Sequence, residues 1–135
     1  DEAFLSAAPR LRAVFYGAGS VRYFTTEAFW RRGIVLSGAG AANAVPVAEY
    51  TLATILLGLK QFWRRADAAR RGEGWGDHTR PMPGAFRSTV GLVSFGMIAR
   101  RTAALLARHD VEVIAHCPFA TPGCDARRHV TFVTL

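Results

Sequence analysis

The chain has 135 residues, about the size of one domain, and half of them are hydrophobic, which excludes a disordered protein. Its 17 basic and 10 acidic residues give a net charge of +7, which is compatible with nucleic-acid binding. However, the arginines occur in scattered pairs without interleaved aromatic residues, so we expect solvated surface and no nucleic-acid partner. The five pairs are Arg31–Arg32, Arg64–Arg65, Arg70–Arg71, Arg100–Arg101 and Arg127–Arg128.

Neither the cysteines nor the apolar stretches indicate an extracellular or membrane protein. Cys117 and Cys124 form neither a metal-binding pair nor a disulfide framework, so we expect reduced thiols in a cytoplasmic protein and no metal site. The most apolar stretch, residues 45–59, is interrupted by Glu49 and is shorter than the ~20 residues of a membrane span. We therefore expect no membrane partner.

The first third of the chain alternates strands and a helix. Residues 11–16 and 34–36 are short apolar runs, and both are predicted to be strands. Between them, one of two threonines can cap a short helix over residues 25–30. Residues 37–44 are rich in glycine and alanine and are predicted to be flexible.

A long helix is predicted to follow, over residues 46–70, because Pro46 suits the first turn of a helix. This helix carries more apolar surface than one small half-domain can cover, so it predicts a two-fold contact between two copies of the chain. The residues expected at that contact are Ile55, Leu59, Phe62 and Trp63.

The second half of the chain has the order strand, glycine turn, helix, strand. The apolar run Val90–Phe95 meets Gly96, an amphipathic segment covers residues 97–108, and a second strand-like run covers residues 111–115. This is the order of a dinucleotide-binding βαβ unit, whose two strands we expect to be parallel and adjacent. Residues 129–135 are predicted to begin a further strand.

The glycine fingerprint of such a unit, G-x-G-x-x-G, reads Ser94, Gly96 and Ala99 here. Ser94 can replace the first glycine only if its φ stays negative, whereas Gly96 still lets the backbone approach a pyrophosphate. Amides at the start of the following helix could face a phosphate. The acidic residue that holds the ribose is expected ~20 residues further on, where Cys117 stands. An ordinary strand–turn–helix without a ligand therefore stays open as an alternative.

Four stretches of the chain, in their order and spacing, resemble the D-isomer-specific 2-hydroxyacid dehydrogenases. They read PRLRAVFYGAGSV, EAFWRRGIVLSGAGAANAVPVAEYTLATILLGLK, TVGLVSFGMIARR and VIAHCPF. The resemblance implies an α/β fold, with residues 1–44 as the end of a flavodoxin-like substrate domain. It implies that residues 45–135 are a linker helix and the first part of a Rossmann NAD(P)-binding domain. The linker helix would pack across the interface of a homodimer.

The resemblance also implies roles for particular residues. The turn with Gly19 and Ser20 matches the loop that receives the substrate carboxylate, and Asn43 matches a hinge position near substrate and cofactor. Cys117 replaces the ribose-binding aspartate. The residues that match the cofactor's pyrophosphate loop are Ser94, Phe95, Gly96, Met97 and Ile98.

The cofactor implied by the resemblance is NAD or NADP. Because Cys117 provides no carboxylate, the choice between the two stays open and weak binding of either is expected. Arg127 and Arg128 lie in the next loop, where they could meet the 2′-phosphate of NADP or simply be solvated.

The implied reaction is hydride transfer between a nicotinamide and a small 2-hydroxy or 2-keto acid. The family's catalytic arginine and histidine–glutamate pair lie beyond the position that matches Leu135, and none of His78, His109, His116 and His129 matches them. We therefore assign no catalytic residue and expect a fragment or truncated form that is inactive by itself. Two alternatives stay open, a non-catalytic dimerisation or binding module derived from this family and a basic nucleic-acid binder.

Overall fold

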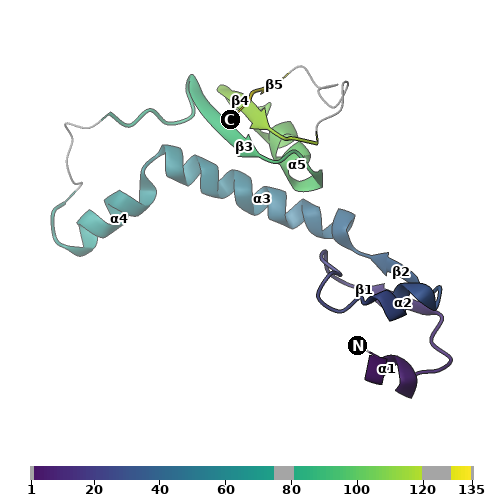
Figure 1. Cartoon of the computed structure of the whole chain (residues 1–135). Coiled ribbons are helices and arrows are strands. Elements are labelled where there is room, and N and C mark those ends of the chain that lie inside the picture. The colour runs from purple at the N-terminus through teal and green to yellow at the C-terminus, as the bar shows by residue number, and fades with distance from the viewer. Residues whose placement is uncertain (1, 75–80, 120–128, 135) are drawn as a thin grey trace. The chain divides into compact units, whose positions relative to one another are not determined.

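The computed structural model describes residues 2–74, 81–119 and 129–134. These residues belong to two compact units, Asp1–Ala44 (unit 1) and Val45–Leu135 (unit 2). Each unit combines helices with a parallel sheet (Figure 1). The α/β class expected from the sequence is therefore confirmed, whereas the assignment of each unit to a substrate or cofactor domain stays a prediction.

Unit 1 contains two parallel strands with a helix between them in sequence. Its elements are α1 (Glu2–Ala7), β1 (Ala13–Tyr16), α2 (Glu27–Arg31) and β2 (Val35–Gly38). The strands pair from Ala13 opposite Val35 to Tyr16 opposite Gly38, so their carboxyl ends lie together. Of the two expected caps, Thr26 begins α2.

Arg32 ties α1 to the rest of unit 1. Its guanidinium donates hydrogen bonds to the carbonyl oxygens of Leu5 at 2.6 Å, Pro9 at 2.9 Å and Ala8 at 3.0 Å. One charged side chain thereby adds hydrogen bonds to three carbonyl groups at the end of a short helix, two of which, those of Leu5 and Ala8, also accept from backbone N–H groups. The buried core of unit 1 consists of Leu5, Phe29 and Ile34.

Unit 2 contains a three-stranded sheet in the order β3-β4-β5, and every neighbouring pair is parallel. Its elements are the greater part of α3 (Gly40–Leu59), then α4 (Phe62–Arg70), β3 (Ser88–Val93), α5 (Met97–Leu106), β4 (Val111–His116) and β5 (Val130–Phe132). The expected parallel pairing of the strands on either side of α5 is confirmed.

The core of unit 2 is formed by the sheet, α5 and one face of α3. Leu52, Ile55 and Leu59 of α3 pack against this core. Part of the apolar surface of Ile55 and Leu59 is thus used within the unit, and their expected place at a contact between two chains stays a prediction. The buried core residues are Val90, Phe95, Ala103, Leu106, Val113 and Ala115.

The long helix begins earlier than expected. Residues 40–44, predicted to be flexible, form the first turn of α3, and Pro46 is the seventh residue of the helix rather than part of its first turn. Alanine has the highest helix propensity, and Ala44 and Ala48 are almost completely buried on one face, so burial outweighs the glycine-rich composition. Pro46 has no N–H for the carbonyl of Ala42, which leaves a gap in the hydrogen-bond ladder of the helix.

The long helix also ends earlier than expected, because it breaks between α3 and α4. Gln61 adopts a left-handed conformation with φ of 53°, which no helix interior tolerates. Residues 81–84 provide hydrogen-bond partners at this break. The Gly84 N–H donates to the Leu59 carbonyl at 3.3 Å, and the side-chain Nε2 of Gln61 donates to the Pro81 carbonyl at 2.8 Å. Residues 46–70 are therefore two helices and not one.

By length and composition alone, α3 could cross a membrane, since it is a 20-residue apolar helix. The expectation that this apolar stretch is too short to span a membrane is thus wrong, because the helix extends beyond residues 45–59. Two other features favour a helix of a globular unit: Glu49 lies in its middle, and Leu52, Ile55 and Leu59 cover a protein core rather than lipid. The absence of a membrane partner stays a prediction.

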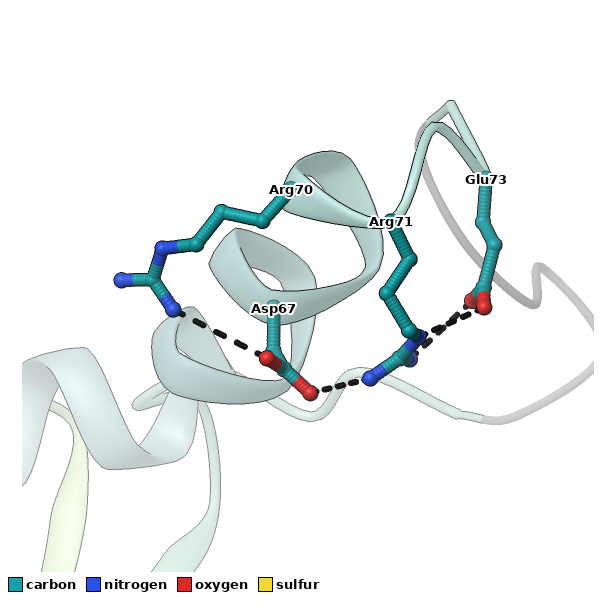
Figure 2. A network of polar contacts seen from close by, with 4 residues as sticks. All are labelled: Asp67, Arg70, Arg71 and Glu73. Carbon is teal, nitrogen blue, oxygen red and sulfur yellow. Dashed lines mark hydrogen bonds and ion pairs between the residues drawn. The ribbon is translucent and has the colours of Figure 1, made fainter.

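A network of four charged side chains closes the end of α4 (Figure 2). Arg71 donates to the two carboxylate oxygens of Glu73 at 2.6 and 3.1 Å, and also to Asp67, whose carboxylate lies 3.7 Å from Arg70. The hydrogen bond from Arg71 lowers the pKa of Glu73 below its ordinary value. Because all four side chains are exposed, the network orders the helix end more than it stabilises the fold.

We expect Arg32→Met to destabilise unit 1 by about 1–2 kcal/mol, since three carbonyls lose a charged donor at a partly exposed site. Urea unfolding and hydrogen exchange of the α1 amides measure this loss. The matched control is Arg31→Met, because Arg31 pairs with exposed Glu27 at 3.9 Å. Equal effects of the two variants would contradict the role given to Arg32.

We expect the last turn of α4 to fray in acid. The lowered pKa of Glu73 means that its pairing with Arg71 is complete above the ordinary glutamate pKa and is lost as the pH falls through the folded-state value. Cα chemical shifts of residues 68–72 should therefore move toward coil values on going from neutral pH to acid, and Glu73→Gln should cause the same movement at neutral pH. Helical shifts that persist in both cases would exclude this role.

Candidate functional site

The carboxyl edge of the sheet in unit 2 brings together the turn before α5 and the residue after β4. Val93 and His116, the last residues of β3 and β4, lie opposite each other. One residue further, the Ser94 N–H donates to the His116 carbonyl at 2.7 Å. The turn at residues 94–96 and Cys117 therefore lie side by side, at the edge where open parallel sheets bind their ligands.

Ser94 makes the turn out of β3 in a left-handed conformation, with φ of 72°. The condition that serine can make this turn only with a negative φ is therefore wrong, since Ser94 makes it with the positive φ that glycine adopts without cost. A serine in this conformation is strained by roughly 1–2 kcal/mol, so other contacts must hold the turn in place.

Gly96 leaves room for a close approach to the backbone. Its φ of −77° is accessible to any residue, so conformational freedom does not explain the glycine. A Cβ atom built at Gly96 would have no heavy atom within 4 Å, which leaves open space next to the backbone. Gly96 is also the N-cap of α5 and provides no capping side chain, so the first amides of the helix are available to an anion. Backbone and space here fit a pyrophosphate.

The three other residues of the expected pyrophosphate loop differ in what they present. Phe95 is only 8% exposed, and its ring packs edge-to-face on Phe132 with 5.1 Å between ring centroids. Its side chain therefore belongs to the core, and only its backbone can serve a ligand. Met97 and Ile98, in the first turn of α5, are exposed.

Cys117 directly follows β4 and is half-buried, packed against the core of unit 2. Its neighbour His116 makes a hydrogen bond between ring Nδ1 and the Val133 carbonyl at 3.1 Å, which links the ends of β4 and β5. A thiol at position 117 lacks the carboxylate oxygens with which an aspartate accepts hydrogen bonds from a ribose. The backbone of the site thus fits a dinucleotide, while the ribose end lacks its acid.

Arg100 is a residue of this site that the sequence reasoning missed. Its Nε donates to the Phe95 carbonyl at 3.1 Å, and its guanidinium carbon lies 5.8 Å from the centroid of the Phe95 ring. Arginine pairs in this chain were interpreted as solvated surface. Its position in the sequence could have indicated this contact. Arg100 lies one helical turn after Gly96, and side chains of a helix lean toward its N-terminus, so the side chain of Arg100 reaches back to the turn.

The expected substrate residues lie in unit 1, at the carboxyl edge of its two strands. Gly19 and Ser20 are exposed in the loop after β1, and the carbonyl of Ala18 lies 3.6 Å from a Cβ built at Gly38, at the end of β2. Asn43 is exposed in the first turn of α3, where its N–H donates to the Ala39 carbonyl at 2.9 Å. The structure tests neither a carboxylate at this loop nor a hinge at Asn43.

Other expected residues have structural positions or cannot be placed. His109 follows the end of α5, and its N–H donates to the Leu106 carbonyl at 2.8 Å. His129 is exposed before β5. The remaining expectations concern residues outside the described part of the chain, namely His78, Cys124, Arg127 and Arg128.

Comparison with known sequences identifies the domain that surrounds this site. Residues 52–135 match the D-isomer specific 2-hydroxyacid dehydrogenase, NAD binding domain. The whole chain is 31% identical to D-3-phosphoglycerate dehydrogenase of Mycobacterium leprae (strain TN) and covers 25% of it. The chain thus spans about a quarter of the length of the curated relatives it matches.

Solved structures show the same fold. A D-lactate dehydrogenase from Aquifex aeolicus, complexed with NAD and lactic acid, matches 99% of this chain with 40% of its own, at a TM-score of 0.77 and 21% identity. An NAD-dependent formate dehydrogenase from Staphylococcus aureus, in complex with NAD, matches 100% of this chain with 40% of its own, at a TM-score of 0.70 and 20% identity. These structures support the Rossmann-like fold of the NAD-binding domain, and the sequence match covers more than half of the chain. The chain therefore belongs to the D-isomer-specific 2-hydroxyacid dehydrogenase family, a family of NAD-dependent oxidoreductases.

Proposed function

We propose that this chain is a portion of an NAD-dependent dehydrogenase that acts on a small 2-hydroxy or 2-keto acid. When bound, NAD supplies the hydride acceptor. Residues 94–98 hold its pyrophosphate through backbone amides, and Cys117 lies against the adenosine ribose. The observation that carries the proposal is the uncapped start of α5, which follows directly from β3 with open space beside Gly96.

Unit 1 takes the role of the substrate side in this proposal. The exposed loop at Gly19 and Ser20 follows a parallel strand, as ligand loops do in α/β proteins, and its backbone amides suit a carboxylate. Asn43 is proposed to be a hinge residue near substrate and cofactor, at the start of the helix that leads from the substrate part to the cofactor part. The choice of 2-hydroxy acid rests on parts of the site outside these residues.

We further propose that the 135 residues by themselves turn over no substrate. Hydride transfer to a keto acid needs a clamped carboxylate, a polarised carbonyl and a proton donor at hydrogen-bond distance. The described histidines are His109, which follows α5, His116, whose ring nitrogen is bound to the Val133 carbonyl, and His129, which is exposed just before β5. None of these three matches the family's catalytic histidine.

A homodimer is proposed through α3 and α4, with a revised set of contact residues. Leu57 and Tyr50 lie two turns apart on α3 and are 39% and 74% exposed, while Phe62 and Trp63 of α4 are 48% and 52% exposed. Trp63 folds back so that its ring lies 3.5 Å from a Cβ built at Gly58, which joins the two helices into one apolar surface. Such a surface is typical of contacts between subunits.

The cofactor proposal is tested by titrating the chain with NADH and NADPH and following nicotinamide fluorescence. We expect weak binding by the unaltered chain. Cys117→Asp should strengthen NADH binding by about tenfold to a hundredfold, because a carboxylate adds a charge-assisted hydrogen bond of roughly 1.5–3 kcal/mol to the ribose. NADPH should gain less, since the same carboxylate repels its 2′-phosphate.

Cys117→Asn is the matched control, because it has nearly the same shape as aspartate without the charge. It should recover only a small part of the gain in NADH affinity. If Cys117→Asp changed the affinity for neither cofactor, residue 117 would not reach the ribose. If NADH did not bind to any of the three proteins, the cofactor site itself would be excluded.

The dimer proposal predicts that Leu57→Asp makes the chain monomeric at micromolar concentration. An interface of this kind should bury more than ~1,000 Å² in total, and a carboxylate at its centre is desolvated without a partner. Sedimentation velocity measures the change. Phe86→Asp is the control, because Phe86 is 65% exposed outside both helices. An unaltered chain that sediments as a monomer would refute the proposal.

A further inference from the structure

Ser94 has a left-handed backbone conformation that is strained for a residue with a side chain. Contacts elsewhere in the described structure must therefore hold the turn in place. With φ of 72°, Ser94 favours relaxation of the turn toward the ordinary negative-φ region. Its own N–H is bound to the His116 carbonyl, which fixes the side of the turn that faces β4. The other side, at Phe95 and Gly96, leads into α5 and needs a separate anchor.

The anchor on that side is Arg100. Its Nε donates to the Phe95 carbonyl at 3.1 Å, and its guanidinium carbon lies over the Phe95 ring, 5.8 Å from the ring centroid. The same ring packs edge-to-face on Phe132 of β5. Phe95, which lies between Ser94 and Gly96, is therefore held at two points. Arg100 of α5 binds its carbonyl, and Phe132 of β5 packs against its ring.

We propose that Arg100 is a positioning residue, which keeps the turn at residues 94–96 in the conformation that presents the first amides of α5 to a dinucleotide. The inference rests on the proposed cofactor site. Arg100 acts through the Phe95 carbonyl and not through the ligand. Removing it lets the strain at Ser94 relax the turn, and the fraction of molecules with a competent site falls.

Lysine cannot take over this role. A guanidinium donates through Nε while its plane lies over the ring, whereas an ammonium group is a single strongly hydrated charge on a flexible stem. Arg101 is the internal comparison: it has the same charge, is exposed as Arg100 is, and lies next to Arg100 on the same helix. Its position, one residue further along α5, turns its side chain to a different face of the helix from that of Arg100.

The test is a double-mutant cycle on NADH affinity, measured with the full 135-residue chain. Arg100→Met and Arg100→Lys should each raise the Kd for NADH about fivefold to tenfold, whereas Arg101→Met should change it less than about twofold. Ser94→Gly removes the strain, so in that background Arg100→Met should change the Kd less than about twofold. Thermal unfolding of all variants verifies that they are folded.

A direct contact between Arg100 and the phosphates gives a different pattern. Arg100→Lys would then keep most of the affinity, and Arg100→Met would lose as much affinity in the Ser94→Gly background as in the unaltered chain. Either result overturns the inference while leaving the proposed function intact, and so does an Arg100→Met variant that binds as Arg101→Met does.

A ligand-free measurement decides the case in which the unaltered chain does not bind NADH. Amide chemical shifts of residues 94–98 should move in Arg100→Met and stay in place in Arg101→Met, because only the former loosens the turn. Such a difference supports the positioning role even when the unaltered chain does not bind NADH, and the cofactor site is excluded only if Cys117→Asp and Cys117→Asn also fail to bind. Unchanged shifts in both variants overturn the positioning role.

Discussion

The parallel pairing of β3 with β4 is the constraint on which the rest of unit 2 depends. The ladder runs from Ser88 opposite Val111 to Val93 opposite His116 and is extended by the hydrogen bond from the Ser94 N–H to the His116 carbonyl. Because a parallel pair requires a crossover, the same ladder dictates that α5 begins at this edge of the sheet. A register shift of one residue would turn the side chains of the shifted strand to the opposite face of the sheet and would move the turn at residues 94–96 away from Cys117.

Packing and ligand geometry are coupled at this edge. Phe95 belongs to the core through its side chain and to the turn through its backbone, so the contact between Phe95 and Phe132 influences where Gly96 lies. Rigid packing of this kind allows a strained serine to persist at a position that ordinarily requires glycine. The departures from the family's fingerprint are therefore unequal: Ser94 is accommodated by its surroundings, whereas Cys117 removes a charge that no contact in the described residues replaces.

The sequence predicted the βαβ order of unit 2 because strand-like runs and an amphipathic helix alternate there with clear turn signals. It failed where tertiary contacts override local preference. Residues 40–44 begin a helix in which Ala44 and Ala48 are buried, and this helix ends at the left-handed Gln61, where the Gly84 N–H binds the Leu59 carbonyl. For the candidate site, spacing singled out Gly96 and Cys117, whose binding roles stay proposals. The left-handed turn at Ser94 and the contacts of Arg100 with Phe95 depend on tertiary structure that no local pattern encodes.

β3 and β4 lie close together in the sequence, and this has a consequence for the order of folding. Ser88 pairs with Val111 about two dozen residues later, while the part of α3 that packs on the same core lies well upstream. Closing a short loop costs less conformational entropy than closing a long one, and local contacts form early in folding. The segment from β3 to β4 is thus suited to act as a folding nucleus during synthesis, with the turn at residues 94–96 already formed before α3 docks.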